Sequence, residues 1–349
     1  MILKSYMRET LIGSTKFYQL YFHYGIVKIK EKNSSNIVLK KRIHSIIKSI
    51  PIIQRLMRMK PRAVLALDNN SFIFSDHGYV YHCSALDKQL IVEHKFSKGM
   101  NNPLSFCTRY DENEKLVDVI YGEYIGNGDR GPVSIYKRVS DKKWDKVYTF
   151  PSNTIQHIHN IVFDKFRNRY LIMTGDSDNE SGIWDADINF KIVKPIVKGS
   201  QKYRACVLMP TENYLYYVTD TPLEQNYVYR LDSNGKTQQV SEMPGPCIFG
   251  MEKNGYLYFS TSVEGDPTLG RWKYRLSNKL GAGVKDRYSH LFRLSNEGEI
   301  EEITKLKKDW LPMWLFEFGN MKFPFSNEEK VYVCPQSLKA KYGTYIIEE

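Results

Sequence analysis

Residues 213–236, NYLYYVTDTPLEQNYVYRLDSNGK, contain two short runs rich in tyrosine and valine. A polar turn separates the two runs, and a second polar turn follows them. Tyr, Val and Thr favour β-strands, whereas Asp, Asn, Gly and Pro favour the turns that end strands. The stretch therefore predicts two antiparallel strands joined by a turn.

The rest of the chain repeats this unit. The aromatic residue of the second run has counterparts along the chain at spacings of 55, 48, 45 and 63 residues. Two further β-rich runs accompany most copies, which gives four short strands per unit. Four-stranded units at such a period are typical of a β-propeller. We count six blades, anchored at Tyr81, Tyr136, Trp184, Tyr229, Phe292 and, more weakly, Tyr345.

The charge of the chain divides it into a basic N-terminal segment, residues 1–61, and a propeller, residues 62–349. Residues 1–62 hold 14 Lys and Arg but 2 Asp and Glu, a net charge of +12. The remaining residues hold 36 Lys and Arg and 37 Asp and Glu, a net charge of −1. A nucleic-acid-binding domain would carry basic residues on its own surface. The sequence therefore argues against nucleic acid as a partner.

Two elements are predicted in the N-terminal segment. Residues 18–30, YQLYFHYGIVKIK, are expected to close the ring, because the last blade lacks an outer strand where the chain ends. Residues 38–60 place apolar side chains at helical spacing with Lys and Arg between them, interrupted at Pro51. This amphipathic helix either packs under the propeller or makes peripheral contact with an anionic membrane.

No run in the sequence reaches the ~20 apolar residues of a membrane-spanning helix. The N-terminus lacks the apolar core and cleavage site of a signal peptide. The five cysteines are scattered, without the spacing of a metal site. We therefore expect a cytoplasmic protein with reduced thiols, peripheral to the inner membrane if the helix binds lipid.

Propeller geometry brings several polar residues to one mouth. The innermost strand of each blade starts on the face where the turn between strands two and three lies. His157 and His159 start one such strand and, two residues apart, point to the same side. The candidate catalytic residues are His157, His159, Glu123, Tyr124, Tyr203 and Asp176, and the candidate substrate-binding residues are Arg204, Arg62, Asp76, Asp220, Gln225 and Glu264.

These residue types suit acid–base chemistry on a charged substrate. Glu123 and Tyr124 could form an acid–phenol pair that acts as base or nucleophile, and Arg204 could form a fork onto a carboxylate. Each also has a structural explanation, because acids in turns cap backbone N–H groups. His157 and His159 could give two imidazoles to a metal, but we predict no metal and no cofactor.

Several stretches resemble the sialidase-like BNR/Asp-box β-propellers, in particular a glycosyl-hydrolase-like branch from bacterial polysaccharide contexts. The matching stretches lie between about residues 62 and 270 and include YGEY, SIYKRVSDKKW, HIHNIVFD, TGDSD and GSQKYRA. Ser140, Asp141 and Trp144 match a shortened Asp box, which is a structural turn in that family. The resemblance implies that Asp76 corresponds to the family's acid, and Arg62 and Arg204 to two members of its arginine triad.

Three functions follow from these candidates. The first is a glycan-active enzyme that cleaves a glycosidic bond of an acidic sugar, either as a hydrolase with paired carboxylates or as a lyase with His, Tyr and Arg. The many acids at the mouth would repel a long polyanion, which favours the hydrolase. The second is a non-catalytic propeller that binds a glycan or a partner in polysaccharide biosynthesis at the inner membrane. The third is a transferase, although no nucleotide-binding motif is present.

Overall fold

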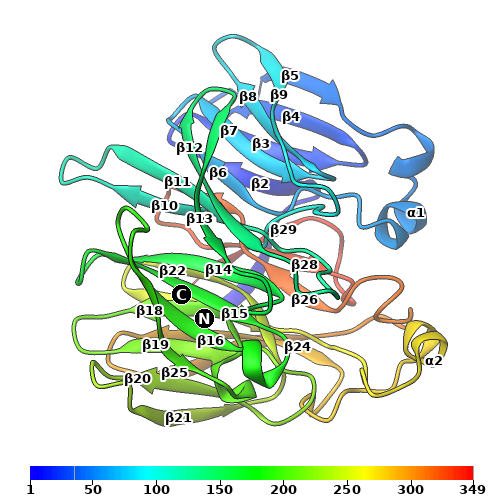
Figure 1. The fold of residues 1–349 in the computed structure, drawn as a ribbon. Coiled ribbons are helices and arrows are strands. Elements are labelled where there is room, and N and C mark those ends of the chain that lie inside the picture. The colour runs from blue at the N-terminus through cyan, green and yellow to red at the C-terminus, as the bar shows by residue number, and fades with distance from the viewer. Residues whose placement is uncertain (35, 349) are drawn as a thin grey trace.

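The fold is a closed ring of small antiparallel sheets. The computed structural model describes residues 1–34 and 36–348. In these ranges, seven sheets are arranged around a central axis as the blades of a β-propeller (Figure 1). Each blade has four antiparallel strands, which are consecutive along the chain in six of the blades, and one blade has a short fifth strand. The prediction of an all-β propeller with four-stranded blades is therefore confirmed.

Blades 1 to 4 follow one another along the chain, and each runs from an inner strand near the axis to an outer strand at the rim. Their strands are β2 (Thr10–Ser14), β3 (Tyr18–His23), β4 (Ile26–Glu31) and β5 (Ile37–Arg42); β6 (Val64–Ala66), β7 (Ser71–Asp76), β8 (Tyr79–Ser84) and β9 (Gln89–Lys95); β10 (Cys107–Tyr110), β11 (Leu116–Gly122), β12 (Val133–Ser140) and β13 (Lys143–Phe150); and β14 (His157–Asp164), β15 (Arg169–Gly175), β16 (Gly182–Asp187) and β17 (Val193–Lys198).

Blades 5 and 6 have the same order, whereas blade 7 takes its outer strand from the other end of the chain. The strands are β18 (Ala205–Pro210), β19 (Leu215–Thr219), β20 (Asn226–Leu231) and β21 (Thr237–Met243); β22 (Cys247–Lys253), β23 (Tyr256–Thr261), β24 (Tyr288–Ser295) and β25 (Ile300–Lys307); and β26 (Asn320–Lys322), β28 (Tyr332–Gln336), β29 (Thr344–Glu348) and β1 (Ile2–Met7), while β27 (Phe325–Ser326) pairs in parallel with β2.

The predicted number of six blades is wrong, because the N-terminal segment contains a blade of its own. Residues 10–42 form blade 1, and residues 62–348 contribute to the other six. Residues 18–30 lie within blade 1 and do not close the ring. The closing strand is β1, which pairs with β29 from Ile2 opposite Glu348 to Met7 opposite Thr344. The two ends of the chain therefore share one sheet (Figure 1).

The predicted helix over residues 38–60 is also wrong. Its first part is β5, and the rest contains a 3₁₀ turn η1 (Ile47–Ser49) and the short helix α1 (Pro51–Leu56). Proline lacks an N–H group and is well placed at the first turn of a helix, so Pro51 starts α1 instead of interrupting a longer helix. The other helical elements are η2 (Asp178–Glu180), η3 (Gln201–Tyr203) and α2 (Arg271–Leu276).

A layer of buried apolar side chains lies between each pair of neighbouring blades in the described part of the chain. Between blades 3 and 4, for example, Ile120 and Ile135 pack with Ile158 and Ile172. Because neighbouring blades cover both faces of a sheet, inner strands are buried on both sides and have near-continuous apolar sequences. These layers fix the positions of the inner strands and of the loops at their ends.

The loops that carry the candidate site share one face of the ring. Since successive strands are antiparallel, the turn between strands two and three lies on the same face as the connection to the next blade. The helices α1 and α2 belong to these two kinds of loop, and both project on one side of the ring in Figure 1. We call this face the mouth.

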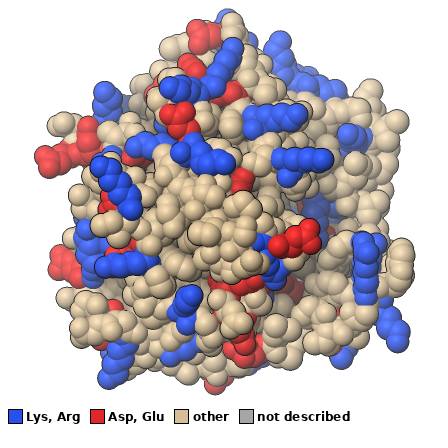
Figure 2. Space-filling view, in the orientation of Figure 1, with Lys and Arg blue, Asp and Glu red and all other residues tan. Residues whose placement is uncertain are grey.

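The surface seen in Figure 2 carries lysines and arginines interspersed with acidic residues. It has no continuous basic surface, so the positive excess of residues 1–62 is not gathered into one patch in this view. In the ranges that the structure describes, no helix has the length and apolar character needed to cross a bilayer.

Candidate functional site

Two histidines at the start of the innermost strand of blade 4 are the centre of the mouth. His157 and His159 begin β14 and are both buried. Their rings lie on the same side of the strand, with the two Nε2 atoms 3.1 Å apart. The His157 Nδ1–H group donates to the carbonyl of Ile125, and the His159 Nδ1–H group donates to the carbonyl of Ala205, each at 3.0 Å.

Asp176, in the turn after β15, faces both imidazoles. One carboxylate oxygen lies 3.2 Å from His159 Nε2, and the other lies 3.5 Å from His157 Nε2. Burial alone would raise the pKa of Asp176, but hydrogen bonds with the two histidines and the charge of Arg204 outweigh it and hold this pKa well below its usual range. Asp176 is therefore a carboxylate at neutral pH.

Arg204, just before β18, has a different role from the one predicted. Its Nη2 atom lies 2.9 Å from Asp176 Oδ1, and its Nη1 atom donates to the backbone carbonyl of Asp176 at 3.1 Å. The guanidinium is thus already paired with a carboxylate of the protein. It positions Asp176 and is not free to hold the carboxylate of a substrate.

Arg62 and Tyr124 form the neighbouring part of the mouth. The Tyr124 ring centroid lies 4.4 Å from that of His157, and the Arg62 guanidinium lies 5.2 Å from the Tyr124 ring centroid. Burial lowers the pKa of Arg62 and raises the pKa of Tyr124. Within the described residues, Arg62 has no carboxylate partner, so its charge faces the mouth without compensation.

Asp220 and Glu264 lie behind this group. Asp220 accepts a hydrogen bond from the Cys206 thiol at 3.2 Å. Burial and the nearby Asp220 raise the pKa of Glu264 to about 8, against the opposing charge of Arg204. Glu264 is therefore a neutral acid at pH 7, beside ionised groups.

Two of the predicted residues have structural roles. The Glu123 carboxylate turns into blade 3, where it accepts hydrogen bonds from the Ser134 backbone N–H at 2.7 Å and from the Ser97 hydroxyl. It therefore forms no acid–phenol pair with Tyr124. Asp76 is buried between His44 and His77, so it does not correspond to an exposed catalytic acid.

Two further candidate residues stabilise loops. The Gln225 side-chain amide donates to the backbone carbonyls of Asn226 and Met243, each at 2.7 Å. Tyr203 ends the turn η3 and packs on the apolar layer between blades 4 and 5, with the Lys202 ammonium 5.7 Å from its ring centroid. Neither residue contacts the two histidines.

A cavity of about 450 Å³ opens at the mouth, and it contains a residue that the sequence reasoning missed. Arg62, Tyr124 and His157 line it together with Glu317 and Lys322. Lys322 belongs to β26, the inner strand of blade 7. That strand spans only Asn320–Lys322, and a three-residue strand leaves little signal in the sequence.

The Lys322 ammonium is an unusual group for a protein interior. Burial, with help from the nearby charges of Arg62 and Lys60, lowers the pKa of Lys322 to about 7, against the attraction of Glu317. Glu317 is paired with Lys60 at 2.9 Å, whereas Lys322 forms no ion pair among the described residues. A large fraction of Lys322 is thus a neutral amine at pH 7.

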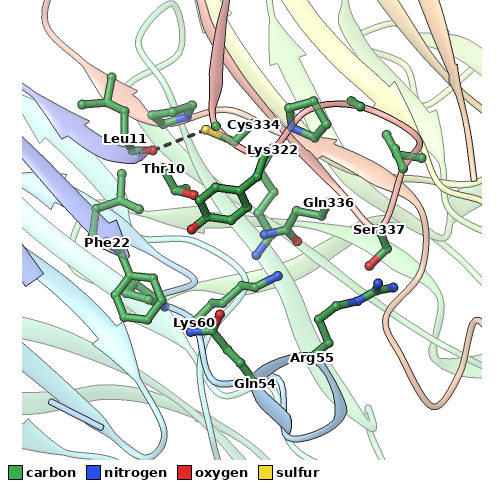
Figure 3. Close-up of a pocket in the computed structure, with 18 of the residues that line it drawn as sticks. Thr10, Leu11, Phe22, Gln54, Arg55, Lys60, Lys322, Cys334, Gln336 and Ser337 are labelled. Atoms are coloured by element: carbon green, nitrogen blue, oxygen red, sulfur yellow. Dashed lines mark hydrogen bonds between the residues drawn. The ribbon is translucent and has the colours of Figure 1, made fainter. Parts of the chain in front are cut away.

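A second cavity of about 240 Å³ adjoins the first between blades 1 and 7. Lys60, Lys322 and Gln336 line both cavities. Figure 3 shows the Lys60, Gln54 and Gln336 side chains gathered in this pocket. The basic wall formed by Lys60, Arg62 and Lys322 therefore faces two adjoining spaces.

His157, His159 and Asp176 also have the composition of a metal site. Their ligand atoms lie within 4.8 Å of one another. Two imidazoles and one carboxylate are a common ligand set for zinc and other first-row transition metals. The sequence alone predicts no metal here, because only the fold brings Asp176 to the two histidines.

Comparisons with known proteins identify the fold of the chain and no family. No family model matches the chain, and no curated protein matches its sequence. Among solved structures, an oligogalacturonate lyase from Vibrio parahaemolyticus is 8% identical with a TM-score of 0.56, covering 99% of this chain and 90% of the lyase. The WD40 β-propeller domain of Doa1 is 11% identical with a TM-score of 0.54, covering 99% of this chain and 95% of that domain. At these identities the shared property is the β-propeller fold.

Proposed function

We propose that this chain is a glycan-active enzyme that cleaves an acidic sugar chain in the mouth cavity, by β-elimination next to a uronate carboxylate. The observation that carries the proposal is the composition of the cavity wall. Arg62 and Lys322 face the cavity without carboxylate partners among the described residues, next to Tyr124 and His157. The carboxylates of Glu123 and Asp76 are directed elsewhere.

An anionic substrate would compensate the charge of this wall. Charged groups taken out of water are usually paired, because an isolated buried charge is costly. Arg62 is half-buried and stacks on Tyr124, which leaves the fork of its guanidinium available to a carboxylate. Lys60 is engaged with Glu317. We therefore assign to Arg62 the binding of the uronate carboxylate.

The neighbouring groups suit the proton transfers of an elimination. Neutral Lys322 takes the proton on the carbon that bears the carboxylate, and the electron pair forms a double bond as the bond from the next carbon to the glycosidic oxygen breaks. Tyr124 gives its proton to the departing oxygen. Arg62 stabilises the charge that develops on the carboxylate in the transition state. The products are an unsaturated uronate and a new reducing end.

Hydrolysis is the second candidate, and one observation favours it. Glu264 is a neutral acid at pH 7 while Asp176 is ionised, and such a difference between two carboxyl groups is typical of glycosidases. However, neither Glu264 nor Asp176 lines the cavity. Elimination uses groups that do line it, so we prefer elimination.

The experiment is a substrate panel read out in two ways. Uronate-containing oligosaccharides, including oligogalacturonates, and neutral glycans are incubated with the protein. Ultraviolet absorbance of unsaturated uronates and new reducing ends are then followed. Elimination gives both signals, with uronate substrates only. Reducing ends without the absorbance would support hydrolysis, and binding without either signal would support a non-catalytic glycan-binding propeller or a transferase.

Matched variants assign the roles. Lys322→Met and Arg62→Met should each reduce kcat/KM by at least about 100-fold, the usual range for loss of a general base or of a charge-stabilising group. Lys339→Met is the control, because Lys339 is exposed and lies outside both cavities. Full activity of the Lys322→Met protein would remove Lys322 from the mechanism.

A further inference from the structure

We propose that His157, His159 and Asp176 bind a divalent first-row transition metal, with zinc as the first choice. The inference does not depend on the enzymatic activity proposed above, because metal binding is measured on the protein alone. The three ligand atoms come from two adjacent strands of blade 4, since the histidines start β14 and Asp176 follows β15. They form a compact group, with separations of 3.1, 3.2 and 3.5 Å.

The hydrogen bonds of the two rings fix which nitrogen atoms are available. A backbone carbonyl can only accept a hydrogen bond, so the Nδ1 atoms of His157 and His159 must carry the protons that they donate to Ile125 and Ala205. In a neutral imidazole the other nitrogen is then unprotonated. Both Nε2 lone pairs therefore point into the same small space. This arrangement, in which the outer nitrogen is held by a carbonyl, is typical of metal-binding histidines.

The space between these atoms needs a cation. Two nitrogen lone pairs 3.1 Å apart, with carboxylate oxygens 3.2 and 3.5 Å from them, repel one another unless a metal ion or a proton lies between them. A metal ion with metal–nitrogen bonds of about 2.1 Å places two adjacent ligand nitrogens about 3.0–3.4 Å apart. The separation of the two Nε2 atoms is in this range. An extra proton shared by His157 and His159 is the alternative, and the experiment below separates the two.

The surroundings hold the ligands in place. Arg204 contacts Asp176 Oδ1, and the Gln201 side-chain amide donates to the Asp176 backbone carbonyl at 2.8 Å. A side chain at Gly175 would place its Cβ 2.5 Å from the Cε1 atom of His159. A residue larger than glycine would therefore displace the imidazole. Such support around the ligands is usual at metal centres, where it fixes ring orientation.

Other clusters of metal-binding residue types are less suitable. Cys206 and Asp220 lie near His159, but the thiol donates a hydrogen bond to Asp220 and both groups are satisfied. His82, Glu93 and Asp141 form a third cluster. Its carboxylates are occupied by an arginine that pairs with Glu93 and Asp141. At the start of β14, Arg204 pairs with only one Asp176 oxygen, and the two Nε2 atoms and the other Asp176 oxygen still face one another across a small space.

One ligand, His157, also lines the mouth cavity. A metal ion at this position would stand beside the sugar that the cavity is proposed to hold. Its positive charge would add to that of Arg62 in attracting a carboxylate. The ligand set leaves coordination positions open, as in catalytic and not in structural zinc sites.

The test measures metal binding by the full chain. The protein is treated with a chelator and dialysed, and Zn²⁺ or Mn²⁺ binding is measured by calorimetry and elemental analysis at neutral pH. We expect one tightly bound ion per chain, which raises the melting temperature and is released as the pH falls, because protons compete for the imidazoles. A chain that binds no more Zn²⁺ or Mn²⁺ than its Asp176→Asn variant would overturn the proposal.

Variants identify the ligands. Asp176→Asn and His157→Ala should each weaken binding by at least about 10-fold, whereas His77→Gln, at the rim of the same cavity, should leave it unchanged. If a histidine variant fails to fold, Co²⁺ is added to the wild-type protein instead. Visible absorption bands typical of Co²⁺ with nitrogen ligands support the site, and their absence at saturating Co²⁺ contradicts it.

Discussion

Two buried glutamates illustrate how residue type alone leaves function open. Glu93 accepts hydrogen bonds from the Trp144 indole at 2.9 Å and from Arg138 at 2.7 Å. Glu93 lies on β9 and Trp144 on β13, so this contact ties blade 3 to blade 2. Glu264 has an unpaired buried oxygen instead and faces another acid. The same side chain is thus a charged anchor at one site and a neutral acid at the other.

Replacing Glu93 by Gln should destabilise the protein at neutral pH. Burial would raise the pKa of Glu93, but hydrogen bonds with His82, Arg138 and Trp144 and the charge of Arg138 lower it to about 2. A lowered pKa stabilises the fold above the unfolded value of 4.5, and this contribution is lost as the pH falls toward 2. We expect a loss of roughly 1–3 kcal/mol in the free energy of unfolding at pH 7.

Denaturant unfolding of both proteins between pH 7 and pH 3 checks this prediction. The difference between wild type and Glu93→Gln should shrink as the pH falls. A difference that stays constant over this range would show that the Glu93 charge is not responsible.

Replacing Glu264 by Gln should have the opposite effect. Its pKa is raised to about 8, first by burial and then by the nearby charge of Asp220. The charge of Asp176 adds to this rise, whereas the charges of Arg204 and Arg58 oppose it. A raised pKa favours the fold fully below 4.5, and this contribution is lost as the pH rises to 8. The side-chain amide of Gln does not titrate, so the stability of the variant lacks this pH dependence.

The measurement is the melting temperature of wild type and Glu264→Gln from pH 5 to pH 9. The free energy of unfolding of the variant should increase relative to that of the wild type as the pH rises, by an amount on the order of 1–3 kcal/mol at pH 9. If the two curves stay parallel from pH 5 to pH 9, Glu264 is already ionised in the folded protein at pH 5.

At the scale of strands, glycines permit close contact between blades. Gly122 ends β11, and a Cβ atom there would lie 2.4 Å from the Cγ2 atom of Ile158 on β14. The two strands can approach only because no side chain stands between them. Since Ile158 lies between the two histidines, this contact also sets where the imidazoles lie.

Gly122→Ala should therefore lower the free energy of unfolding by about 1–3 kcal/mol, the usual cost of overpacking. It should also weaken metal binding, because Ile158 must move. Gly126→Ala is the matched control, since a Cβ at Gly126 meets nothing within 4 Å. Calorimetric melting of the two variants tests the prediction, and equal melting temperatures would contradict it.

The N-terminal strands show why a local pattern can mislead. Strand β5, IVLKKR, carries a run of basic residues, and its apolar residues continue at helical spacing into the next segment. That pattern fits a helix as well as a strand on the rim of a ring. Its backbone hydrogen bonds with β4 decide for the strand, and the periodicity of residues 38–60 taken alone does not include that partner.

At the scale of the whole molecule, β1 holds the ring closed. It is hydrogen-bonded to β29, and Leu3 and Met7 pack on the apolar layers at the two sides of blade 7. Without β1, the outer edge of β29 would be open to pairing with other chains.

Deleting residues 2–7 should lower the free energy of unfolding by roughly 2–5 kcal/mol, from the backbone hydrogen bonds lost, and should promote association. Thermal unfolding and size-exclusion chromatography measure both effects. Lys4→Gln is the control, because it removes only the exposed ion pair with Glu348 and should change stability by less than about 1 kcal/mol. A truncated chain that stays monomeric and equally stable would contradict the role of β1.

The sequence alone determined the class of fold and part of the site. Strand and turn propensities, repeated along the chain, fix four-stranded blades, because alternating aromatic and β-branched runs must be buried between sheets. The i and i+2 spacing of His157 and His159 fixes their common direction.

The tertiary structure decided the rest. The number of blades and the closing strand depend on pairing between the two ends of the chain. The role of Arg204 and the pKa of Lys322 depend on groups brought together from different blades. The two imidazoles share one strand, but the carbonyls of Ile125 and Ala205 that orient them belong to the neighbouring blades. Charge pairing and burial act through space, and a ring brings together residues that lie far apart in the sequence.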